Sequence, residues 1–318
     1  MPEPLILPFA GLPLNDDGRA PAAEPPPLPN LAALLARLAP GTRDDADAYR
    51  LNPPHERALA RALGLQAADG CLPWAAHTAT ADGIDAGALA WGLLSPVNWQ
   101  VGRESLTMGD PATLGLDTAR SRAFFDLLQP LLADAGWPLL WGAPTRWYVT
   151  HESLAALPTA SLDRVIGRNP DVWLPDTPAA KPFKRLASEV QMLLYTHPLN
   201  EAREAAGELP LNSVWLSGCG RRQTPRADAA VSVDDRLRAP ALAGDWPGWC
   251  AAWQSLDAGP VAALRAAAER GETVLLPLCG ERSAASFATG TTRAPLWQRV
   301  RARLAPPRVD TGALLAAL

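Results

Sequence analysis

The chain has 318 residues, of which 48% are hydrophobic and 19% are charged, a composition typical of a soluble globular protein with one large domain or two ordinary ones. Its formal net charge is −4, and the positive charge is almost all arginine, because Lys181 and Lys184 are the only lysines. This charge, without any long basic run, argues against a nucleic-acid binder held mainly by phosphate contacts.

The N-terminal part of the sequence predicts one strand and two helices. The apolar run 5–11 predicts a buried strand. Leucines at helical spacing over 28–38 predict a helix with Asn30 as its N-cap. Residues 40–54 are polar and rich in turn formers, and residues 55–65 predict a second short helix.

The middle of the sequence predicts several strands around one long helix. Segments 90–94 and 99–109 have the apolar character of strands, and 116–136 is an amphipathic helix with Asp117 as its N-cap. Residues 137–152, rich in aromatic and β-branched side chains, predict two further strands. This succession is sufficient for a small α+β subdomain.

The C-terminal part alternates helices with strands. Segment 182–207 has a helical apolar face, 212–222 predicts a strand ending in a Gly-x-Gly turn, and 259–271 predicts a short helix. Segment 272–280 predicts another buried strand, and 294–305 a basic helix. Strands that alternate with helices predict an α/β protein whose mostly parallel sheet has helices on both faces.

Cysteine spacing and hydropathy predict the cellular compartment. None of the four cysteines forms a CxxC pair, so a zinc ribbon or a thioredoxin-like site is not expected. No apolar run approaches the ~18 residues that span a bilayer, and the start MPEPLILPFAG lacks the features of a secretory signal. We therefore expect a cytoplasmic protein with reduced thiols and no membrane partner.

Chemistry-bearing side chains concentrate in the segment 196–222. His197, Asn200 and Arg203 are spaced at i, i+3 and i+6, so a helix would project them toward roughly one side. His197 also precedes a proline, where a histidine commonly hydrogen-bonds at a helix boundary. These residues are therefore candidates both for ligand binding and for a purely structural role.

The strand that follows this helix offers a candidate anion site. Asn212 opens the strand, and Gly218, Gly220, Arg221 and Arg222 lie at its far end. Ligands of open α/β sheets bind beyond the carboxyl ends of the strands, and a Gly-x-Gly turn with two arginines suits an anion. The alternative is a surface turn with solvated arginines, and Asn200 and Asn212 could equally satisfy buried backbone groups.

Two other patterns have simpler structural explanations. Trp246, Trp249 and Trp253 are spaced along one helical face, which indicates packing rather than stacking on a ligand. The acidic stretch 81–85 imitates a metal motif, but its Gly- and Ala-rich setting indicates a solvated turn.

The segment HPLNEAREAAGELPLNSVWLSGCG, residues 197–220, resembles the HPxN-x2-R-x3-G-x2-P-x-N-x-(I/V)-W-L-x-G-x-G segment of archaeal-type cofactor-independent phosphoglycerate mutases, in the alkaline phosphatase superfamily. Three weaker similarities fall in the same order. Segment 5–11 resembles the family's first strand, 28–38 its TPNLDALA helix start, and 117–152 the helix and strand pair of its inserted domain. Bacterial RpfE-type regulatory proteins, related to these mutases, are a closer resemblance.

This resemblance implies a domain organisation. Residues 1–95 and 175–318 would form an alkaline-phosphatase-like α/β core, and residues 96–174 an inserted α+β subdomain.

The sequence departs from the family where the family binds metal. Its mutases transfer phosphate through a serine or threonine nucleophile with two divalent ions held by several Asp and His. Here Ala10 stands in Phe9-Ala10-Gly11 where the family has Asp-Gly. The late strand 275–287 offers Cys279 and Glu281 but no histidine. A two-metal phosphoryl-transfer site is therefore not expected, nor any other cofactor.

Three functional hypotheses follow. The first is a mutase-like ligand-binding or regulatory protein without mutase activity, whose partner is a small phosphorylated or anionic ligand or another protein. The residues that would bind the ligand are His197, Asn200, Arg203, Asn212, Gly218, Gly220 and Arg221. The second is an active mutase or phosphatase with manganese or zinc at a rearranged site. Its candidate ligands are Asp16, Asp17, His77, Asp82, Asp85 and Glu281. The third is a structural or interaction protein whose motif residues only hold the fold.

Overall fold

A computed structural model of the chain describes residues 3–13, 23–102, 106–290 and 309–318. The contacts between residues divide the chain into two compact units. Unit 1 comprises Met1–Ala48, Pro53–Gly64 and Pro225–Leu318, and unit 2 comprises Tyr49–Asn52 and Leu65–Thr224. The boundaries at 96 and 174 that the resemblance implied both fall inside unit 2. The expected basic helix 294–305 lies outside the described residues, as do Asp16 and Asp17.

The strands of unit 1 are partly parallel and partly antiparallel. β1 (Leu5–Ile6) pairs in parallel with β9 (Ser232–Val233), and parallel bridges, among them Leu7 to Leu278, join it to β10 (Leu275–Cys279). On the other side of β10, β11 (Ser283–Thr289) and β2 (Leu38–Asp45) continue the sheet in antiparallel pairing. The parallel part is therefore limited to three short strands.

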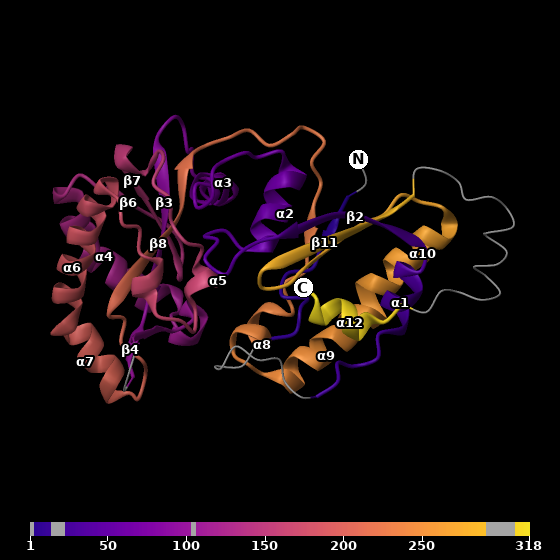
Figure 1. Cartoon of the computed structure of the whole chain (residues 1–318). Coiled ribbons are helices and arrows are strands. Elements are labelled where there is room, and N and C mark those ends of the chain that lie inside the picture. The colour runs from indigo at the N-terminus through magenta and orange to yellow at the C-terminus, as the bar shows by residue number, and fades with distance from the viewer. Residues whose placement is uncertain (1–2, 14–22, 103–105, 291–308) are drawn as a thin grey trace, which may run out of the picture. The chain divides into compact units, whose positions relative to one another are not determined.

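Helices cover both faces of this sheet, as Figure 1 shows for α2 on one side and for α1, α9 and α10 on the other. Alternation along β1 explains the two faces, because Leu5 and Leu7 pack into the larger apolar cluster while Ile6 contacts Ala58 of α2. The helices are α1 (Pro29–Leu35), α2 (Pro54–Leu63), α8 (Arg238–Leu242), α9 (Trp246–Leu256), the π-helical turn η5 (Asp257–Val261), α10 (Ala262–Arg270) and α12 (Thr311–Ala316).

Two sequence predictions for unit 1 are wrong. Asn30 is not the N-cap of α1, which begins at Pro29 without a side-chain cap. Instead the buried carboxylate of Asp257 accepts hydrogen bonds from the backbone N–H of Leu31 at 2.7 Å and of Asn30 at 3.2 Å. The polar segment after Leu38 is a strand, because it pairs with β11 through its backbone while its side chains remain mostly exposed.

Unit 2 contains a four-stranded sheet that is antiparallel throughout. Its order is β6 (Leu139–Ala143), β7 (Arg146–Thr150), β3 (Ala90–Val97) and β8 (Ser213–Arg221). A separate hairpin is formed by β4 (Trp99–Val101) and β5 (Leu106–Met108).

The helices of unit 2 lie on both faces of its sheet, with α4 and α6 on one face and α3 on the other (Figure 1). Asp117 caps α4 as predicted, its carboxylate accepting from the N–H of Arg120 at 2.8 Å. The helices and turns are α3 (Trp74–Ala81), η1 (Pro111–Leu114), α4 (Thr118–Asp134), η2 (Glu152–Leu154), α5 (Leu162–Val165), η3 (Pro170–Trp173), η4 (Pro178–Ala180), α6 (Lys181–Tyr195) and α7 (Pro198–Ala205).

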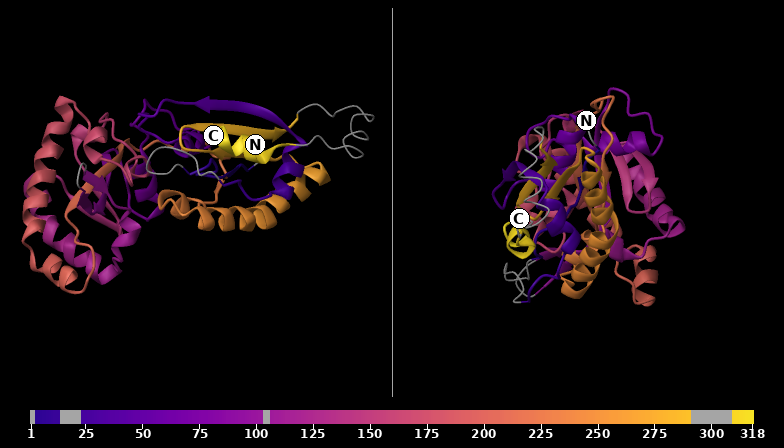
Figure 2. Two further views of the ribbon diagram at one scale, coloured as in Figure 1. Left: turned by 60° about the horizontal axis from the view of Figure 1, so that its bottom comes forward. Right: turned by 90° about the vertical axis from the view of Figure 1, so that its right-hand side faces the viewer.

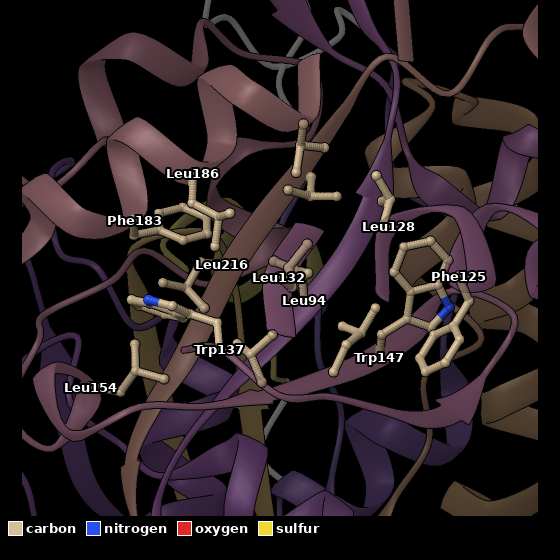
Figure 3. Close-up of a cluster of buried hydrophobic side chains, with 14 of the residues drawn as sticks. Leu94, Phe125, Leu128, Leu132, Trp137, Trp147, Leu154, Phe183, Leu186 and Leu216 are labelled. Atoms are coloured by element: carbon tan, nitrogen blue, oxygen red, sulfur yellow. The ribbon is translucent and has the colours of Figure 1, made fainter. Parts of the chain in front are cut away.

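The core of unit 2 lies between the sheet and the pair α4 and α6 (Figure 3). Leu94 of β3, Trp147 of β7 and Leu216 of β8 project into it, and they meet Phe125 of α4 and Phe183 of α6. The amphipathic patterns read from the sequence account for these contacts.

The chain is thus a mixed α/β protein, as predicted, but the expected mostly parallel sheet is not confirmed. Most strand pairs are antiparallel, and parallel pairing in the described residues is confined to the short strands around β1 and a few isolated bridges. None of the helices in the described residues combines the length and the apolar character that crossing a membrane requires.

Candidate functional site

The residues of the signature segment belong to unit 2, and Asn200 forms a buried polar junction there. The side chain of Asn200 is on α7 and bonds the backbone on both sides of the α7–β8 connection. Its amide donates to the carbonyl of Leu194 at 2.9 Å and of Leu211 at 2.7 Å, and its oxygen accepts from the N–H of Leu211 at 2.9 Å. All three of these hydrogen bonds join the Asn200 side chain to backbone groups of the chain.

His197 is the N-cap of α7. Its Nδ1 accepts a hydrogen bond from the N–H of Leu199 at 3.2 Å, which satisfies one of the free donors of the first helical turn. Pro198 follows at the first helical position, where its missing N–H has no consequence. The HPxN spacing therefore places a cap and a buried amide at the start of one short helix.

Arg203 is buried on the same helix, with its side chain 6% exposed. Its Nε donates to the carbonyl of Leu209 at 2.8 Å, its Nη2 donates to the carbonyl of Leu114, and its Nη1 lies 3.1 Å from the carboxylate of Glu208. Burial lowers the pKa of this guanidinium, and the Glu208 carboxylate opposes that shift. The arginine joins the α7–β8 connection to η1.

Asn212 fixes the entrance of β8 to the start of β4. Its oxygen accepts from the N–H of Trp99 at 2.7 Å, and its amide donates to the carbonyl of Trp99 at 2.9 Å. A single side chain thus pairs with both backbone groups of one residue, as a neighbouring strand would do.

The glycines of the signature lie inside β8, so the predicted Gly-x-Gly turn is wrong. Gly218 has φ +61° and Gly220 has φ +151°, and both are buried against the start of α3. A Cβ on Gly218 would lie 3.0 Å from the backbone nitrogen of Ala75 and the Cβ of Trp74. On Gly220 it would lie 3.0 Å from the Cβ of Pro73. These glycines let α3 approach the strand closely.

Arg221 is more exposed than Arg203, with a side chain that is 46% exposed. It donates to the carbonyl of Ala88 and pairs with the carboxylate of Glu152. The structure therefore places all seven candidate residues in unit 2, but Asn212 and Arg221 lie at opposite ends of β8. Each of the seven supports a local junction of the fold.

The metal ligands that the resemblance implies do not fit the residues present at the end of β1. Ala10 is fully buried there, and its N–H donates to the carbonyl of Cys279 at 2.7 Å. Burial raises the pKa of the Cys279 thiol to about 12, so the thiolate that binds metal is disfavoured. Within the described ranges, no group of three or more His, Cys, Asp and Glu side chains could hold a metal ion.

The four histidines have structural surroundings and belong to separate places in the fold. Besides His197, His55 lies 5.2 Å from the ring of Phe9, His77 lies 5.8 Å from Trp74, and His151 stacks on Trp137 at 4.4 Å. Burial lowers the pKa of His77, which favours its neutral form.

The tryptophans of α9 pack in the core, as predicted. Trp249 and Trp253 are fully buried, and the indole N–H of Trp249 donates to the carbonyl of Phe9 at 3.0 Å. Trp246 stacks on Trp249 at 5.1 Å between ring centroids and is partly buried.

The sequence patterns do not predict one polar cluster, which is formed by Asp82, Arg146 and Tyr148. Asp82, assigned to a solvated turn, accepts hydrogen bonds from the Arg146 guanidinium at 2.9 and 2.6 Å and from the Tyr148 hydroxyl at 2.6 Å. A Cβ on Gly142 would lie 2.6 Å from the same carboxylate, so glycine leaves room for the cluster. The hydrogen bonds from Arg146 lower the pKa of Asp82, and burial raises the pKa of Tyr148 to about 12.

The Asp82 cluster predicts an acid-dependent contribution to stability. Because the pKa of Asp82 in the folded state is below its ordinary value of 3.8, the ionised carboxylate stabilises unit 2 above that pH. The contribution is lost as the pH falls through the folded-state pKa. We expect Asp82→Asn to lower the free energy of unfolding by about 1 kcal/mol at pH 7. Urea unfolding should show this difference shrinking below pH 3.8.

Asp85→Asn is the matched control, because the Asp85 carboxylate accepts a local hydrogen bond from the N–H of Gly87. A pH-independent effect of Asp82→Asn, or an equal effect of Asp85→Asn, would show that the ion pair does not stabilise the fold.

Comparison with known proteins gives structural likenesses at low identity. No protein-family model matches the chain, and no curated protein matches it either. Among solved structures, the cofactor-independent phosphoglycerate mutase from Thermoplasma acidophilum DSM 1728 is 15% identical, with 92% of this chain and 91% of that one covered at a TM-score of 0.37. The PH0037 protein from Pyrococcus horikoshii is 12% identical, with 92% and 89% covered at a TM-score of 0.45.

Proposed function

We propose that this chain is a phosphoglycerate-mutase-like protein that does not perform two-metal phosphoryl transfer and acts as a ligand-binding or regulatory protein. The observation that carries the proposal is the end of β1. By the resemblance of residues 5–11 to the family's first strand, Ala10 stands where those mutases have a metal-binding aspartate. Ala10 is fully buried, and its N–H donates to the carbonyl of Cys279.

The partner in this proposal is a small phosphorylated or anionic ligand, or another protein, in the cytoplasm. Of the charged signature residues, Arg221 supports a ligand role best because nearly half of its side chain is exposed. Arg203 supports it least, since its guanidinium bonds two backbone carbonyls. We propose no nucleic-acid or membrane partner.

A structural or interaction role is the second candidate, and a specific observation favours it. Asn200, Asn212 and Arg203 direct their polar atoms to the chain's own backbone. A signature used in this way supports a protein whose motif is retained for folding.

The proposal is tested by turnover and by ligand binding. With 3-phosphoglycerate and manganese, we expect no conversion to 2-phosphoglycerate above the protein-free rate, because the resemblance places Ala10, which has no side-chain donor, where those mutases bind metal through an aspartate. We also expect 3-phosphoglycerate to raise the melting temperature when chelator is present, since a ligand selective for the folded state stabilises it. Turnover that chelation abolishes would contradict the proposal.

Arg221→Ala separates the two candidates, with Arg185→Ala as its matched control, because Arg185 is an exposed arginine on α6 that also pairs with a glutamate, Glu189. The ligand-binding proposal predicts that the thermal shift is lost in Arg221→Ala and kept in Arg185→Ala. A shift that is unchanged in both variants would place the ligand elsewhere. Absence of any shift with the parent protein would favour the interaction role. Arg203→Ala is unsuitable, because it also removes backbone contacts of the fold.

A further inference from the structure

The segment Val309–Leu318, which contains α12, lies over the carboxyl ends of the parallel strands β1 and β10. The N–H of Leu12, just after β1, donates to the carbonyl of Leu315 at 3.2 Å. The N–H of Ser283, just after β10, donates to the carbonyl of Leu318 at 3.1 Å. Figures 1 and 2 show α12 beside β11. We call this segment the cover.

The cover is held mainly by apolar contact. Leu315 is 1% exposed and belongs to the apolar cluster that includes the β1 and β10 leucines. Val309, Leu314 and Leu318 pack against the same cluster from its margin, as does Phe9. The Arg43 guanidinium adds one hydrogen bond to the carbonyl of Ala317 at 2.7 Å.

Two glycines make room for the cover. A Cβ on Gly280 would overlap the carbonyl of Leu318 and lie 2.7 Å from its Cβ, and a Cβ on Gly11 would lie 3.2 Å from the Cβ of Leu318. Neither glycine has a positive φ, so the backbone there accepts any residue. Glycine at these positions therefore serves the close approach of Leu318.

The covered strand end is also strained. Phe9 is the non-glycine residue with positive φ, +56°, among the described residues. A bulky side chain in this conformation is strained, and such residues concentrate at ligand clamps and switches. The strain lies beside Ala10, where an open α/β sheet would bind a ligand.

We propose that Val309–Leu318 is a detachable cover, which opens as a unit and exposes the carboxyl ends of β1 and β10. In the closed state Leu315 and Leu318 lie against the residues that follow these two strands. This inference does not depend on the proposed function, because it rests on the contacts of the cover alone.

Hydrogen exchange of the unmodified full chain tests the cover directly. The amides of Leu12 and Ser283 bond the cover, whereas those of Leu7 and Cys279 bond between β1 and β10. A cover that opens locally leaves the first pair protected at least about tenfold less than the second. Equal protection of all four amides would overturn the proposal, because the cover would then open only with global unfolding.

Gly280→Ala provides an independent test, since its Cβ would displace Leu318 without altering the backbone. We expect exchange at Leu12 and Ser283 to rise at least about tenfold while Leu7 and Cys279 change less than about threefold. Gly259→Ala is the matched control in the same unit, because no atom lies within 4 Å of its added Cβ. A uniform rise at all four amides in Gly280→Ala would identify the segment as an inseparable part of the core.

Discussion

Replacing Asn200 by alanine is expected to lower the free energy of unfolding by about 3–5 kcal/mol, because each buried backbone group left without a partner costs about 1–3 kcal/mol. Asn200 is 5% exposed, and its side chain satisfies the carbonyls of Leu194 and Leu211 and the N–H of Leu211. Alanine removes all three hydrogen bonds and restores none. Urea unfolding monitored by tryptophan fluorescence measures the change.

Glu204→Ala is the matched control for this prediction, because Glu204 is exposed on the same helix. Its effect should stay within about 0.5 kcal/mol, as for surface substitutions in general. If Asn200→Ala were as mild as the control, Asn200 would not be a structural junction, and its retention in the signature would need a ligand.

Gly218→Ala is expected to destabilise the chain by about 2–4 kcal/mol, from two separate causes. The left-handed conformation at φ +61° disfavours any residue with a Cβ. The added methyl would also lie 3.0 Å from the backbone nitrogen of Ala75, which forces α3 away from β8. Thermal unfolding of the variant measures the sum of both effects.

Gly115→Ala isolates the conformational part, because Gly115 has the same φ of +61° and no atom within 4 Å of the added Cβ. It should cost about 1 kcal/mol. Equal losses in the two variants would mean that the close approach of α3 contributes nothing, and the signature glycine would then need another explanation.

Local patterns were sufficient to predict much of the secondary structure. Asp117 caps α4, and Gly271 ends α10 in a left-handed conformation, because capping depends on a few consecutive residues. The apolar faces of α4 and α6 identified their buried sides for the same reason.

Contacts between distant residues could not be predicted in this way. The carboxylate of Asp257 takes the capping role assigned to Asn30, from more than 200 positions away along the chain. Asp82 and Arg146 likewise lie 64 positions apart in the sequence and meet only in the tertiary structure of unit 2. The direction of the strands could not be predicted either, because alternating helices and strands are also compatible with the antiparallel pairing of β3 and β8.

The sequence named candidate site residues but left their role open. His197 is the N-cap of α7, and Asn200 and Arg203 are buried on that helix. Whether such side chains face a ligand or the backbone depends on the path of the connection to β8, and in the structure it places the Leu211 backbone against Asn200. The sequence predicts a turn at Gly218 and Gly220, because the helix that packs on them, α3, is remote in sequence.

The most direct test of the central claim, that the chain lacks a two-metal phosphoryl-transfer site, is its metal content. The full chain would be purified without chelator, offered manganese and zinc, washed, and examined by elemental analysis. The buried Ala10 at the end of β1 predicts less than one retained ion per chain. Two tightly held ions per chain, the number that phosphoryl transfer of this type requires, would contradict the account.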